Sequence, residues 1–195
     1  MNYIQLVNDV LVRLRESEVS SVSDNAYSKM IGKFVNDAKR NVEDAYNWNS
    51  LSDTLTAVTG ADVFNYVLIG SGQRFRVIDV LNDTSNTEVK GAGTVWMDKQ
   101  FLINNIQKGS PTYYNFNGVD SNGDTQVDLF PIPDGVYNIR FNIILPQPLL
   151  SDNADVVKVP YEPVIFLAYA KALAERGRSE EHTSELQSHS FISYA

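Results

Sequence analysis

The sequence of 195 residues contains no cysteine and only two histidines. The absence of cysteine excludes disulfide bridges, thiolate zinc sites and cysteine nucleophiles. Both histidines, His182 and His189, lie in the segment 178–195. Histidine is the commonest general base and metal ligand, and residues 1–177 have none. We therefore expect a protein that is not an enzyme and that holds no cofactor.

Basic residues are also scarce. Lysine and arginine number 16 against 24 acidic residues, which gives a net charge of −8 and a pI near 4.7. An acidic surface is unsuited to binding phosphate groups, but it lets DNA pass because like charges repel. No apolar run reaches the length of a membrane span, so we expect no membrane association. Apolar content of 43% is ordinary for a globular chain with a core.

The segment 178–195 has no apolar periodicity and is interpreted as artefactual. A permitted codon choice for residues 178–188 resembles the adapter that is ligated to DNA for short-read sequencing. Residues 192–195 fit a second block of the same adapter, in the same frame, after a gap of the kind that holds an index sequence. We predict that the natural sequence is truncated near Gly177, where the adapter replaces its continuation, and we exclude the segment 178–195 from fold reasoning.

Apolar residues at helical spacing predict three helices, near residues 2–15, 24–46 and 161–176. Between them lie short runs rich in β-branched and aromatic residues, which predict antiparallel strands. The predicted strands cover residues 55–59, 63–69, 74–82, 94–98, 112–118, 125–132 and 136–145. Hairpin turns are expected at 70–73 and 120–124, with a further turn at 131–135.

These elements predict an α+β fold, in which a helical layer of three helices accompanies a central antiparallel β-sheet domain. The expected divisions are an N-terminal helical hairpin, 1–53, a β domain, 54–150, a C-terminal helix that completes the helical layer, 151–177, and the artefactual tail, 178–195. Residues expected to be buried are Leu11, Phe34, Trp48, Val77, Phe141 and Leu167.

Two groups of polar residues could form sites by their composition. A weak calcium candidate consists of Asp120, Asn122, Asp124 and Asp128, but the order of an EF-hand loop fails and a tight turn is favoured. Residues 33–44 mix lysine, arginine and acids at helical spacing, which is typical of a solvated face.

The last helix is apolar around most of its circumference, which is typical of a helix that is buried or lies between subunits. Its candidate interface residues are Tyr161, Val164, Ile165, Phe166, Leu167, Tyr169 and Leu173.

Four segments together resemble a known family. Residues 6–22 and 37–58 resemble the first helix, the second helix and the first strand of phage head-to-tail adaptors of the tail tubular protein A type. Residues 129–142 and 159–177 resemble a late strand pair and helix of related phage proteins.

The resemblance implies a structural virion protein, made in the bacterial host cytoplasm and located at the head–tail neck. It implies a ring, commonly of twelve copies, that binds the portal protein and the tail nozzle protein while DNA passes through without specific binding. The alternative is a β-rich phage decoration or receptor-binding module, which would place Trp96, Tyr113 and Tyr114 on an exposed strand face. An enzyme is the third alternative.

Overall fold

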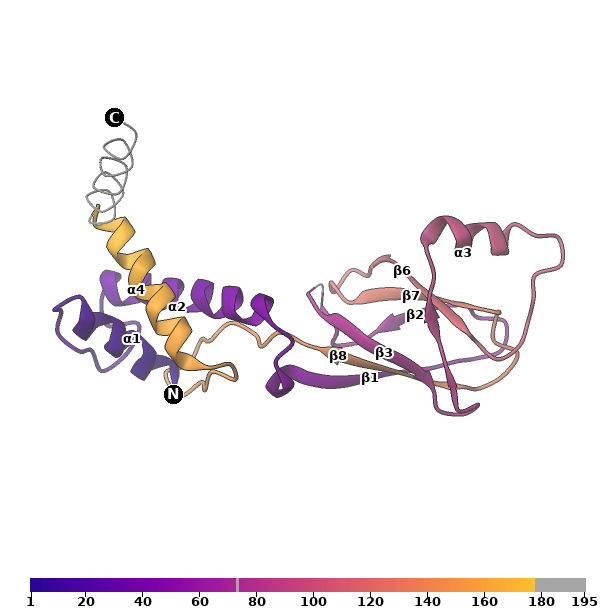
Figure 1. Cartoon of the computed structure of the whole chain (residues 1–195), viewed down its shortest axis with the longest axis horizontal. Helices are drawn as coiled ribbons and strands as arrows, with labels where there is room; N and C mark the ends of the chain where they lie inside the picture. Colours follow the sequence, from indigo (N-terminus) through magenta and orange to yellow (C-terminus); the bar gives the residue numbers. More distant parts are fainter. Residues whose placement is uncertain (73, 178–195) are drawn as a thin grey trace, which may run out of the picture. The chain divides into compact units, whose positions relative to one another are not determined.

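The computed structural model describes residues 1–72 and 74–177. It contains four α-helices and two four-stranded sheets, so the predicted α+β class is confirmed. The chain divides into two compact units. Residues 1–50 and 147–177 form the helical unit, and Leu51–Pro146 form the β unit (Figure 1).

The helical unit contains α1 (Tyr3–Arg13), α2 (Ala26–Ala45) and α4 (Tyr161–Glu175), close to the three predicted ranges. Asn2 and Asn25 begin the first two helices with capping boxes, because each side chain accepts a backbone N–H three residues later. The three helices bury one another's apolar faces. The buried residues include Leu6, Val7, Val10, Leu11, Ile31, Val35, Ala38, Val42, Val164, Ile165, Ala168 and Ala172.

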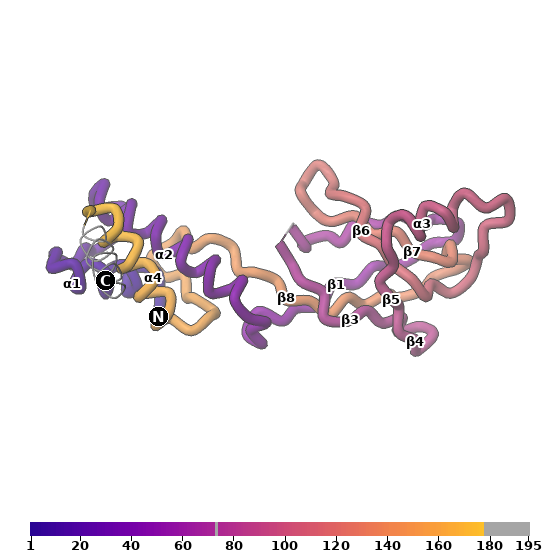
Figure 2. The backbone as a smooth tube through the Cα atoms, turned by 45° about the horizontal axis from the view of Figure 1, so that its top comes forward, coloured from indigo at the N-terminus to yellow at the C-terminus, as the bar shows by residue number. Residues whose placement is uncertain are grey.

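The β unit consists of two sheets packed face to face (Figure 2). One sheet has the order β1 (Ser52–Val58), β8 (Asn138–Ile144), β3 (Arg76–Asn82) and β4 (Thr87–Glu88). The other has the order β2 (Asn65–Leu68), β7 (Thr125–Phe130), β6 (Tyr113–Val119) and β5 (Lys90–Gly91). Alternate residues of both sheets meet in one core. This cluster contains Ala57, Leu68, Val80, Val89, Val127, Leu129, Ile139, Phe141 and Ile143.

Several local predictions were wrong. Residues 94–98 begin α3 (Thr94–Phe101) instead of forming a strand. β5 pairs with β6 in parallel, so the sheets are not purely antiparallel. The turn at 70–73 closes no hairpin, because β2 and β3 lie in different sheets. The hairpin at 120–124 is confirmed: it joins β6 to β7, and Asp120 N–H donates to the Asp124 carbonyl at 2.8 Å.

The predicted core is confirmed in part. Leu11 and Phe141 are buried, whereas Phe34, Trp48 and Val77 are half-buried. Leu167 was wrongly predicted to be buried, because 39% of its surface is exposed. Its position on α4 explains the error, since Val164, Ile165, Ala168 and Ala172 occupy the side of that helix that faces the core.

Candidate assembly face of the helical unit

Helix α4 has two apolar faces. Val164, Ile165, Ala168 and Ala172 form the face that packs against α1 and α2, and all four are buried. The opposite side, which we call the second face of α4, carries no charged residue. It consists of Pro163, Phe166, Leu167, Ala170, Leu173 and Ala174.

The spacing along the second face is i, i+3, i+4, i+7, which places its residues in one stripe along the helix. Phe166 is 55% exposed, and Ala170 and Ala174 are also exposed. Such a stripe is typical of a helix that packs against another protein surface, with alanines that allow close approach.

The structure distributes the predicted interface residues over both faces. Val164 and Ile165 are taken up in the core of their own unit. Tyr161, Phe166 and Leu167 are exposed, and Tyr169 and Leu173 are half-buried. Ala170 and Ala174 were missed, because counting large apolar residues overlooks alanines; the 3–4 spacing after Pro163 was the signal that could have found them.

Charged groups border the second face near the start of α4. The Arg13 guanidinium lies 5.0 Å from the centre of the Phe166 ring, a cation–π contact between α1 and α4. Arg13 also pairs with Asp9 at 3.4 Å. The pKa of Tyr161 is raised, chiefly by its hydrogen bond to the Glu162 carboxylate and by that group's charge. Phe166 is therefore held by a neighbour while its ring stays accessible.

The end of α4 is fixed to the α1–α2 connection through Arg176. Its guanidinium pairs with Glu16 at 2.5 Å and lies 4.8 Å from the Tyr27 ring centre. It also donates to the Leu14 carbonyl at 3.4 Å. The helix is thus held to α1 by an arginine contact near each end, which fixes the direction of its second face.

The segment 147–158, which we call the return segment, ties the helical unit together. Tyr3 N–H donates to the Asp155 carbonyl and Val157 N–H donates to the Met1 carbonyl. On α2, the Asn36 side chain bonds both the N–H and the carbonyl of Leu150, at 2.8 and 3.0 Å. The segment precedes α4 directly, so these bonds set where α4 begins.

Lys39 and Glu43 hold the return segment at its first residue, Gln147. Lys39 Nζ donates to Glu43 Oε1 and to the Gln147 carbonyl, both at 2.8 Å. Gln147 N–H donates to Glu43 Oε1 at 3.2 Å. Both charged side chains are fully buried, so the prediction of a solvated face was wrong at these two positions. The reason is that an unpaired main chain crosses this face of α2 and needs polar partners.

The structure places the residues of the weak calcium candidate in two different settings. Asp120 closes the 120–124 turn: its Oδ1 accepts the N–H groups of Asn122 and Asp124 at 2.8 and 2.9 Å. Asp128 instead lies within β7 and accepts the amide groups of Asn65 and Asn117. Within residues 1–72 and 74–177, no three histidine, cysteine or acidic side chains form a group that could hold a metal ion.

The aromatic residues of the β unit are mostly used internally. Tyr114 packs against Phe116 and Phe141 in the sandwich core. On the outer side, Trp96 of α3 packs against Tyr113 and Phe130, with ring centres 4.8 and 5.6 Å apart. Helix α3 covers this part of the sheet, so the exposed strand face required by a receptor-binding module is not formed there.

Helix α4 thus presents, outside the core of its own unit, an apolar stripe of the kind that often marks a contact with another protein. In the described part of the chain, no helix has both the length and the apolar character needed to cross a membrane.

The model of the SU10 adaptor protein family matches residues 1–189, and the chain therefore belongs to this family. It is a family of structural phage adaptors, components of the virion, and not an enzyme family. No curated protein matches the chain. The family match runs into the segment 178–195, whose predicted artefactual origin lies outside the described residues.

Proposed function

We propose that this chain is a head-to-tail adaptor of the tail tubular protein A type, which forms a ring, commonly of twelve copies, between the portal protein and the tail nozzle protein. The second face of α4 lies in the contacts between subunits and with the portal. Family membership supports an adaptor, and the uncharged stripe on α4 is the observation that supports its use in assembly.

The physical reason is the cost of leaving this stripe in water. Phe166, Leu167, Ala170 and Ala174 share one side of a helix whose other side is already packed. Burying apolar surface gains about 25 cal/mol per Å², so contact with another subunit is favourable. The arginine contacts at Phe166 and Tyr27 hold the helix in place beforehand, which lowers the ordering cost of binding.

The net charge of −8 supports the second part of the proposal, a ring that lines the DNA conduit. Like charges repel, so an acidic wall lets DNA move during ejection without specific binding. No membrane takes part in this function.

The test is co-sedimentation of the full-length chain with purified portal, wild type against Phe166→Asp and Leu167→Asp. Each variant buries a charge in the proposed contact, and we expect assembly to be lost. Asn41→Asp, at an exposed position on α2, adds the same charge elsewhere and serves as the matched control. If Phe166→Asp and Leu167→Asp both assemble like wild type, the second face is not the contact.

A further inference from the structure

A second apolar surface lies at one end of the β unit. The ladders place the end of β1 beside the start of β8, since Val58 pairs with Asn138. In the other sheet, the end of β7 meets the start of β6, since Phe130 pairs with Tyr113. Three loops, 59–64, 102–110 and 131–137, therefore gather at one end of the sandwich, which we call the tri-loop end.

The three loops are fastened to one another. Asp62 N–H donates to the Pro133 carbonyl at 2.9 Å, and the Asp62 carboxylate pairs with Lys108 at 2.5 Å. Gly109 N–H donates to the Ile132 carbonyl, and Ile132 N–H donates to the Gln107 carbonyl, at 2.9 and 3.0 Å. The main-chain bonds give the tri-loop end a defined shape.

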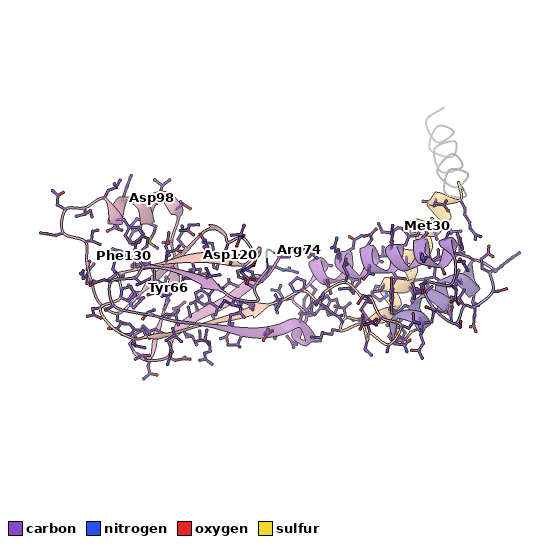
Figure 3. The ribbon with its side chains drawn as sticks, turned by 180° about the vertical axis from the view of Figure 1, so that it is seen from behind. Met30, Tyr66, Arg74, Asp98, Asp120 and Phe130 are labelled. Carbon is purple, nitrogen blue, oxygen red and sulfur yellow. The ribbon has the colours of Figure 1, made fainter. Side chains whose placement is uncertain are left out.

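Bulky aliphatic side chains project from all three loops. Leu102 is 81% exposed and Val136 is 67% exposed, and Val63, Ile103 and Ile106 are exposed as well. The helix that precedes Leu102 is anchored, because Met97 is fully buried and Phe101 packs against Phe64 and Phe130. Figure 3 shows Asp98 on the outer side of this helix and Phe130 on the sheet below it. The exposed apolar residues of loop 102–110 therefore follow a helix that is anchored to the sheet.

We infer that the tri-loop end is the docking surface for a tail-side protein, which receives Leu102 and Ile103 in an apolar groove. This inference rests on the proposed function, because an adaptor must contact a component other than its own copies. It assigns the two kinds of contact to different units, with copies and portal at the helical unit and the tail at the β unit.

Charge distribution favours such a partner over a second copy of this chain. One hollow of the helical unit, of about 740 Å³, is lined by Glu16, Glu18 and Asp24, together with Arg176, which pairs with Glu16. Another, of about 420 Å³, is lined by Lys29, Lys33 and Asp152. Seating Leu102 or Ile103 in either hollow would remove charged groups such as Glu18 or Lys33 from water, which is unfavourable. A groove lined by apolar residues is the complement that the loops require.

The experiment uses full-length chain assembled on purified portal, with purified nozzle protein as the probe. Leu102→Asp/Ile103→Asp should assemble on the portal like wild type and retain nozzle protein at least about tenfold more weakly. Asn104→Asp/Asn105→Asp adds the same charge to the same loop without removing apolar side chains, and should retain nozzle protein like wild type. Leu102→Ser/Ile103→Ser tests the apolar contact without adding charge, and its retention should also fall.

The inference is overturned if Leu102→Asp/Ile103→Asp retains nozzle protein at the wild-type level, or if the asparagine control loses it equally. It is also overturned if wild-type chain assembles on the portal but does not bind nozzle protein. A wild-type chain that fails to assemble on the portal refutes the proposed function instead, so the two failures are distinguishable.

Discussion

The helical unit and the β unit fill their interiors differently. Among the described residues of the β unit, five of the six buried polar side chains are neutral, and the sixth, Asp128, accepts the amide groups of Asn65 and Asn117. In the helical unit, Asn36, Lys39 and Glu43 are buried along one helix, and Lys39 and Glu43 are completely enclosed.

The difference follows from where the main chain finds its hydrogen-bond partners. In the β unit, the ladders satisfy most of the backbone, and neutral side chains satisfy single groups beside them, as Ser71 does when its hydroxyl accepts the Thr125 N–H at 2.8 Å. In the helical unit, Gln147 and Leu150 of the return segment belong to no helix or strand among the described residues. Side chains of α2 take the place of a strand there, which puts an amide and an ion pair in the interior.

The largest expected effect comes from Lys39→Met. The change removes the ammonium group 2.8 Å from the buried Glu43 carboxylate, along with a donor to Gln147. We expect the helical unit to lose about 3–5 kcal/mol of unfolding free energy, because the buried Glu43 carboxylate loses its ion pair with Lys39. The two tryptophans separate the units: Trp48 lies in the helical unit and Trp96 in the β unit. Urea unfolding of Trp96→Phe variants, followed by Trp48 fluorescence, measures the loss.

The control is the double variant Lys39→Met/Glu43→Leu. Replacing a buried ion pair by apolar side chains of similar size is often neutral or stabilising, so this variant should recover most of the loss. If the single change costs less than about 1 kcal/mol, the pair does not lock the return segment and the contrast between the units is weaker than the structure indicates.

The buried Lys39–Glu43 pair is also where prediction from sequence failed most clearly. The apolar stripes of α1, α2 and α4 identified three helices, because burial against a common core imposes a 3.6-residue period. Lys39 and Glu43 follow the same helix but face a segment more than a hundred residues away in sequence. No local pattern records that crossing, so charges at helical spacing resembled a solvated face.

Helix α3 was missed for a different reason. It has only eight residues, too few for a helical period to emerge, and Val95 and Trp96 favour strands. As a helix, this segment covers Tyr113 and Phe130, which belong to strands later in the sequence. A local pattern cannot reveal that contact. The candidate interface was partly predictable: the apolar circumference of α4 was visible, but which side faced its own core depended on α1 and α2.

A smaller effect is expected in the β unit. Ile143→Leu keeps the volume and the apolar character of a side chain in the sandwich core. Volume-conserving apolar changes usually cost less than about 1.5 kcal/mol, and no hydrogen bond is lost. Urea unfolding of Trp48→Phe variants, followed by Trp96 fluorescence, measures this cost. A loss as large as that of Lys39→Met would mean that the sandwich core tolerates a change of side-chain shape no better than the helical unit tolerates loss of the Lys39–Glu43 pair.

The smallest expected effect concerns alkaline pH and again differs between the units. Burial raises the pKa of Tyr114 in the β unit, and it raises that of Tyr3 in the helical unit against an opposing hydrogen bond from Asn36. A raised folded-state pKa means that the stability contribution is fully present below the unfolded value, about 10, and is lost as pH rises through the folded value.

Stability of the β unit, reported by Trp96, should therefore fall with rising pH above about 10, and Tyr114→Phe should make that fall shallower. Part of the slope should remain, because burial also raises the pKa of Tyr66. Tyr3→Phe serves as the matched variant: it should change the alkaline slope reported by Trp48 and leave the Trp96 slope unchanged. An equal change in both slopes would show that the two units unfold as one, and the comparison between separate interiors would no longer hold.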